Sequence, residues 1–116
     1  MDELEPAEME ELRRRILDEL AELTAVSAAA AEDSRPVTLD QQSVGRLSRM
    51  DAMQRQAMAL ASSQRREARL RGLKSALARM EAGEYGFCLT CEEPIAIGRL
   101  RADPIVRSCL ACARLG

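Results

Sequence analysis

Cys88-Leu-Thr-Cys91 and Cys109-Leu-Ala-Cys112 contain all four cysteines of this chain, and seventeen residues separate the two pairs. The pattern C-x2-C-x17-C-x2-C lies within the spacing of four-thiolate zinc sites. Two residues between cysteines allow a tight turn to direct both sulfurs at one ion, and two such turns complete a tetrahedron with bonds of about 2.3 Å. We therefore predict one structural Zn²⁺ held by Cys88, Cys91, Cys109 and Cys112. Four protein ligands leave no open position for water or substrate.

The chain offers little for catalysis and nothing for membrane insertion. It contains no histidine, and no nucleophile lies beside a base in the sequence, so we predict that it is not an enzyme. No apolar run approaches the roughly 20 residues needed to cross a bilayer. The opening Met-Asp-Glu-Leu-Glu lacks the basic and apolar parts of a secretion signal, which predicts a cytoplasmic protein. Reduced, metal-binding thiols are expected in that compartment, and two disulfides are the alternative.

The composition favours long helices over a compact globular core. The 116 residues include one Tyr, one Phe and no Trp, so the bulky side chains that fill most cores are nearly absent. Strong helix formers dominate the first eighty residues, and 31% of the chain is charged. This balance is typical of coiled coils, and it predicts a mainly α fold.

Charge is distributed unevenly along the chain. Residues 1–33 hold eleven acidic residues and three arginines, whereas residues 34–116 hold fourteen basic and eight acidic residues. The two segments could pair with each other, or the charges could steer the molecule onto a partner. The net charge of −2 argues against a general nucleic-acid-binding function.

Apolar periodicity predicts two helices in the first 82 residues. A helix is expected over about residues 7–32, and Pro36 ends the pattern within a break at 34–40. A second helix is expected from about residue 40 to 82. The predicted fold is a long antiparallel helical hairpin (coiled coil) over 1–82, with its turn near 34–40, followed by a small four-cysteine zinc-finger module over 83–116. The two apolar stripes consist of Met9, Leu12, Ile16, Leu20 and Leu23, and of Leu70, Leu73, Leu77 and Met80.

The middle of the second helix is rich in methionine and alanine. Met53, Met58 and Leu60 lie in this part. Methionine packs adaptably and small residues allow close approach of helices, so we interpret this face as core rather than as a ligand surface.

The residues between the cysteine pairs resemble the zinc-finger signature of the DksA/TraR family. The similar stretches are Tyr85-Gly-Phe-Cys-Leu-Thr-Cys91, Pro94-Ile-Ala-Ile-Gly-Arg-Leu100, Ala102-Asp-Pro104 and Cys109-Leu-Ala-Cys112. The resemblance covers residues 85–112 closely and the hairpin more loosely. It implies a bacterial transcription regulator that binds RNA polymerase without specific DNA contact, its hairpin entering the secondary channel. It also implies action together with ppGpp.

The tip of the hairpin departs from the family pattern. The namesake of the family carries an Asp-x-x-Asp-x-Ala motif there, and counting back from Cys88 places Gly45, Ser48 and Met50 at those positions. Asp40, at the predicted turn, and Asp51 are the acidic tip candidates for contact with the polymerase. Each could equally be a helix cap or a solvated side chain.

Basic residues of the second helix form a second candidate contact surface. Arg65, Arg66 and Arg69 could contact acidic parts of the polymerase or the phosphates of ppGpp, or could simply be solvated. Two other functions stay open at this point: a zinc-dependent nucleic-acid-binding module, and a redox-responsive switch in which oxidation of the cysteines releases zinc.

Overall fold

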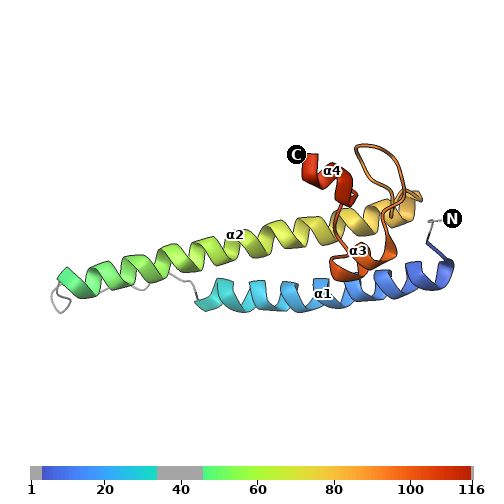
Figure 1. Ribbon diagram of the computed structural model, residues 1–116. Helices are drawn as coiled ribbons and strands as arrows, with labels where there is room; N and C mark the ends of the chain where they lie inside the picture. Colours follow the sequence, from blue (N-terminus) through green and yellow to red (C-terminus); the bar gives the residue numbers. More distant parts are fainter. Residues whose placement is uncertain (1–3, 34–45, 116) are drawn as a thin grey trace.

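The molecule is an elongated helical hairpin with a small module folded against one end (Figure 1). The computed structural model describes residues 4–33 and 46–115, and it measures 67 × 31 × 20 Å. Within these residues there is no β-strand, only an isolated bridge between Phe87 and Pro94. The helices are α1 (Pro6–Asp33), α2 (Arg46–Ala82), α3 (Ile97–Ala102) and α4 (Leu110–Leu115). The mainly α hairpin with a C-terminal cysteine module is therefore confirmed.

The bounds of α1 agree with the predicted helix over 7–32. Pro6 occupies the first turn, where its missing N–H costs nothing. The side chain of Glu8 accepts a hydrogen bond from the backbone N–H of Glu5 at 3.0 Å, which satisfies one of the free donors at the start of the helix. The end of α2 at Ala82 also agrees, whereas the predicted turn at 34–40 lies outside the described residues.

One hydrophobic core joins the hairpin to the C-terminal module. Leu12 and Ile16 of α1 and Leu73 of α2 are fully buried, as their helical spacing predicts. Residues that follow α2 complete the same core from the module side, so the two parts share one interior. These contributors are Tyr85, Cys88, Ile95 and Leu100.

The interpretation of the methionine-rich segment as core is wrong. Met53, Met58 and Leu60 are 67%, 71% and 61% exposed. Arg66 of α2 donates a hydrogen bond to the hydroxyl of Ser27 of α1, and Arg69 of α2 pairs with Glu19 of α1. These two contacts place Asp33, where α1 ends, opposite residues 55–60 of α2. The part of α2 before residue 55 therefore has no α1 partner.

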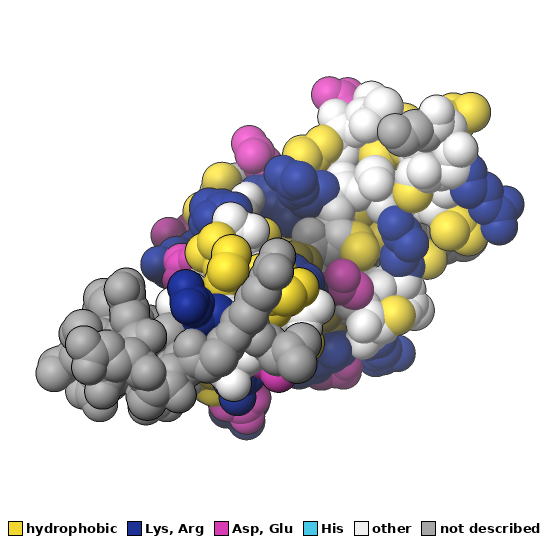
Figure 2. Space-filling model, turned by 90° about the vertical axis from the view of Figure 1, so that its left-hand side faces the viewer, with side chains coloured by type: hydrophobic (Ala, Val, Ile, Leu, Met, Phe, Trp, Pro, Cys, Tyr) yellow, Lys and Arg dark blue, Asp and Glu magenta, His cyan; other side chains and the backbone are white. Residues whose placement is uncertain are grey.

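The exposed part of α2 presents a mixed surface. Figure 2 views the molecule from this end and shows hydrophobic side chains interspersed with Lys and Arg. Asp51 lies here and is exposed. No helix in the described residues is long and apolar enough to cross a bilayer.

Candidate metal centre

The end of α2 directs the backbone into the turn that carries Cys88 and Cys91. Gly83 has a φ of 75°, a left-handed conformation that glycine adopts without strain. The N–H of Gly83 donates to the carbonyl of Met80, and the N–H of Glu84 donates to that of Arg79. This pair of bonds is a Schellman motif, which satisfies the last carbonyls of the helix and reverses the chain direction.

The first cysteine pair lies in a tight backbone turn. Gly86 precedes it with a φ of 94°, and Leu4 packs where a side chain at this position would lie. The N–H of Cys88 donates to the carbonyl of Glu93 at 2.8 Å, and the N–H of Glu92 donates to that of Cys88 at 2.9 Å. The N–H of Thr90 points at the Cys88 sulfur at 3.4 Å. The turn therefore holds Cys88 and Cys91 on the same side.

The second pair is positioned by the start of α4. The N–H of Ala113 donates to the carbonyl of Cys109 at 2.9 Å, and the N–H of Cys112 points at the Cys109 sulfur at 3.4 Å. A backbone bond from Leu89 to the carbonyl of Arg107 ties the two turns together. Each turn thus supplies two sulfurs from a backbone that is already hydrogen-bonded.

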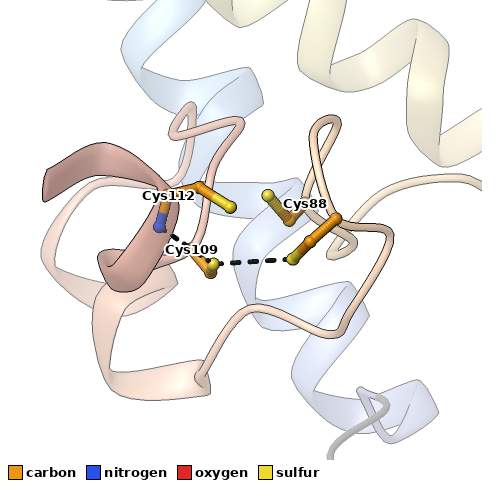
Figure 3. Close-up of side chains that lie close together, drawn as sticks. Cys88, Cys109 and Cys112 are labelled. Carbon is orange, nitrogen blue, oxygen red and sulfur yellow. Dashed lines mark hydrogen bonds between the residues drawn. The ribbon is translucent and has the colours of Figure 1, made fainter. Parts of the chain in front are cut away.

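All four sulfurs converge on one centre. The Sγ atoms of Cys88, Cys91, Cys109 and Cys112 lie within 4.8 Å of one another, and those of Cys91 and Cys109 are 3.7 Å apart. Figure 3 shows the side chains of Cys88, Cys109 and Cys112 directed at a common point. Tetrahedral zinc with bonds of about 2.3 Å requires sulfurs about 3.8 Å apart. The four cysteines therefore fit one Zn²⁺, which would serve as a structural cross-link.

The thiols need a cation to ionise together. The backbone N–H of Cys91, followed by that of Cys109, lowers the pKa of Cys88 to about 6. Side-chain hydrogen bonding to Cys109, followed by Cys88 and Cys91, raises the pKa of Cys112 to about 12. One thiolate is thus favoured at neutral pH and a fourth is not. A dication supplies the charge that four thiolates require.

Tyr85 braces the module internally, and Gly72 lets the module approach α2 closely. The Tyr85 hydroxyl donates to the carbonyl of Pro104 at 2.6 Å, and burial of the ring raises the pKa of Tyr85 to about 12. Gly72 of α2 faces Ile105 so closely that a Cβ atom there would lie 2.5 Å from the end of the isoleucine side chain. The Tyr85 ring, which is 2% exposed, thus forms part of the interior that the module shares with the hairpin.

Ion pairs join α1, α2 and the module. The Arg69 guanidinium binds both carboxylate oxygens of Glu19 side-on and reaches the Asp103 carboxylate at 2.7 Å. Closer to the start of α1, Arg101 of the module binds Glu11 at 3.0 Å. The acidic first segment thus pairs in part with the basic remainder, one of the two readings that the charge distribution allowed.

Glu19→Gln provides a test of this three-way contact. Hydrogen bonds from Arg69 hold the pKa of Glu19 below its ordinary value of 4.5. The carboxylate therefore stabilises the fold above the unfolded pKa, and this contribution is lost as the pH falls through the lower, folded value. We expect Glu19→Gln to lower the free energy of unfolding by under ~1 kcal/mol at pH 7. The difference from the wild type should start to shrink near pH ~4 and should vanish once the pH is below the folded pKa of Glu19.

Urea unfolding at several pH values measures this difference. Glu22→Gln is the matched control, because Glu22 is an exposed acid on the same helix with no ion pair in residues 4–33 and 46–115. An equal loss in both variants, or a loss at Glu19 that is as large at pH 3 as at pH 7, would contradict the assignment.

The other predicted site residues lie apart from the cysteines. Asp51 is exposed near the start of α2, about 47 Å along the helix axis from Ala82. Asp40 lies outside the described residues. Of the basic candidates, Arg65 is exposed, whereas Arg66 is bonded to Ser27 and Arg69 is occupied by Glu19 and Asp103. A partner could contact Arg69 only by exchanging these ion pairs.

Sequence reasoning missed the pairing role of Glu19 and the burial of Arg79. Glu19 and Arg69 are separated by fifty residues, so their contact depends on the register of the hairpin. Arg79 lies off the apolar stripe of α2, because at 3.6 residues per turn it points away from Leu77 and Met80, so the sequence pattern gave no signal of its burial.

Comparison with known proteins agrees with this site and fold. Residues 83–115 match the family of the prokaryotic dksA/traR C4-type zinc finger. No curated protein sequence matches the chain. The solved structure of transcription factor DksA2 from Pseudomonas aeruginosa superposes with a TM-score of 0.78 at 22% sequence identity, covering 96% of this chain and 84% of DksA2. The chain thus carries, over residues 83–115, a zinc finger of the prokaryotic dksA/traR C4 type on a helical hairpin with the fold of DksA2.

Proposed function

We propose that this protein is a non-enzymatic bacterial transcription regulator that binds RNA polymerase directly. The observation that carries the proposal is the likeness in fold to a transcription factor over 96% of the chain, together with a dksA/traR zinc finger. In this proposal residues 1–82 act as the polymerase-binding hairpin and residues 83–116 as the module that anchors it.

The shape supports insertion of the hairpin into the secondary channel. The molecule is 67 Å long and only 20 Å across in its thinnest direction. The finger packs against the end of the hairpin where α2 stops, so the other end is free of it (Figure 1). A hairpin of this shape can enter a channel until the wider end, where the finger packs, stops it. Asp51 lies on the part that would enter.

A pull-down with RNA polymerase core enzyme and holoenzyme tests the proposal. The tagged, zinc-loaded chain should retain polymerase, and duplex DNA alone should not be retained. Failure to bind either form of polymerase would contradict the proposal. Retention of DNA alone in a salt-dependent manner would favour the nucleic-acid-binding alternative.

We further propose that the alarmone ppGpp acts at a groove between α2 and the finger. The groove has a volume of about 700 Å³, and its basic residues suit phosphate groups. Tighter polymerase binding with ppGpp in the same pull-down supports this, and unchanged binding contradicts it. The polar residues that line the groove are Arg71, Ser75, Arg99, Asp103, Arg107 and Ser108.

The tip acids give the sharpest functional prediction. Asp51→Ala, alone and with Asp40→Ala, should abolish the effect on transcription and leave polymerase binding intact, because an acid near the active centre acts after docking. Multi-round transcription from a responsive promoter, beside the pull-down, measures both. Asp18→Ala is the matched control, since Asp18 is an exposed acid on α1 away from this end. An unchanged effect in the double variant would remove the tip assignment.

A further inference from the structure

Arg79 is a buried cation without a hydrogen-bond partner in the described part of the chain. The residue lies in the last turn of α2 and is 9% exposed. Its Nε, Nη1 and Nη2 atoms are all inaccessible and have no acceptor. An ionised group removed from water is strongly destabilising unless an opposite charge or hydrogen bonds compensate it. The fold therefore requires a source of negative potential near Arg79.

The side chains next to Arg79 do not provide this negative potential. The guanidinium stacks over the ring of Tyr85, 5.8 Å from its centroid, which is a weak attraction beside the loss of hydration. Burial lowers the pKa of Arg79, and the like charge of Arg107 lowers it further by a smaller amount. No carboxylate pairs with Arg79 in residues 4–33 and 46–115.

Both neighbours of Arg79 belong to the metal centre. Tyr85 precedes the zinc ligand Cys88 by three residues and shares its hydrophobic cluster. Arg107 precedes the ligand Cys109 by two residues, and its carbonyl holds the first cysteine turn through Leu89. Arg79 thus stacks on Tyr85, the residue from which the chain runs into the first cysteine turn. Four thiolates around one Zn²⁺ have a formal charge of −2, the largest local charge in this part of the molecule.

We propose that Arg79 is the internal counter-ion of the zinc–tetrathiolate group. Its guanidinium offsets part of the −2 charge from the buried side of the site, where Cys88 is buried, whereas Cys91 faces solvent. The positive potential stabilises the thiolates against protonation and lowers their reactivity toward electrophiles. In return, the bound metal centre provides the negative potential that keeps Arg79 buried. Zinc binding and burial of Arg79 therefore reinforce each other.

Zinc affinity, measured by competition with a chromophoric chelator, tests the proposal. Arg79→Met removes the charge and keeps an apolar chain, and it should weaken zinc binding by about 10- to 100-fold, as loss of groups around metal ligands does. Arg79→Lys keeps the charge and should recover most of this loss. The matched control is Lys74→Met, which removes an exposed charge from the same helix and should leave affinity within about twofold.

A purely structural role for Arg79 predicts different results in two further measurements. In the cobalt-substituted protein, Arg79→Met should shift the thiolate-to-metal charge-transfer band to longer wavelength, and Arg79→Lys should not. Without metal, Arg79→Met should be no less stable than the wild type, because an unpaired buried cation has been removed. Unchanged zinc affinity, an unmoved cobalt band, or equal destabilisation with and without metal would overturn the proposal.

Discussion

Replacement of Cys109 by serine is expected to abolish zinc binding and to unfold residues 83–115. A serine hydroxyl is a poor zinc ligand, and the three remaining thiolates cannot close the tetrahedron. Zinc binding in sites of this kind contributes about 10–16 kcal/mol to folding, far more than the small finger can supply from its own apolar contacts. Metal analysis should find one zinc in the wild type and none in the variant. Far-UV circular dichroism should retain much of the signal of α1 and α2.

The matched control for Cys109→Ser is Thr90→Ala. Thr90 lies in the first cysteine turn and is exposed, and its contribution to the sulfurs is its backbone N–H. Its side chain can therefore be removed without loss of zinc. Full zinc stoichiometry and unchanged thermal stability in Cys109→Ser would contradict the four-ligand assignment.

Leu73→Ala should cause the largest loss of stability among substitutions in the hairpin. Leu73 is fully buried where α1, α2 and the finger share one core. Loss of a buried leucine side chain costs about 2–5 kcal/mol, depending on how far the site collapses. Guanidinium unfolding followed by circular dichroism measures this loss. The same variant should loosen the finger, because Leu100 and Ile95 pack into this core.

Leu60→Ala isolates the effect of burial. Leu60 is the same residue type on the same helix, but it is 61% exposed. Its replacement should change the free energy of unfolding by less than ~0.5 kcal/mol. A loss at Leu60 as large as that at Leu73 would show that Leu60 is packed, contrary to its exposure in the structure.

The sequence predicted the features that depend on local pattern. Helical spacing identified Leu12, Ile16 and Leu73 as interior residues, and all three are fully buried. Cysteine spacing predicted the sulfur cluster, since a C-x2-C turn is determined by adjacent backbone. The end of the second helix near residue 82 was also predicted, and α2 does end there, just before Gly83 with its left-handed backbone.

What depends on the length and register of the hairpin could not be predicted. Met53 and Met58 have the composition of a core face, but both are exposed near or beyond the end of α1, and the sequence did not show how far α1 covers α2. From the sequence, Arg69 was a candidate for contact with a partner. Only the packing of α1, α2 and the module shows that Glu19 and Asp103 neutralise its charge. The burial of Arg79 likewise follows from tertiary packing, because a charged residue is ordinarily assigned to the surface.

The metal centre and the proposed site of action lie at opposite ends of the molecule. The zinc stabilises a finger that packs on α1 and α2, and this packing fixes the direction of the hairpin relative to the finger. Asp51 is about 47 Å along the helix from the start of the finger. Changes to the cysteines should therefore affect docking and stability, whereas changes at the tip should affect the consequence of docking.

A structure of the complex with RNA polymerase tests the central claim most directly. We predict that the first part of α2, with Asp51, lies inside the secondary channel, and that the zinc-bound finger rests outside against the rim. A complex in which the finger enters first, or in which the hairpin lies on the outer surface or on DNA, would contradict the account.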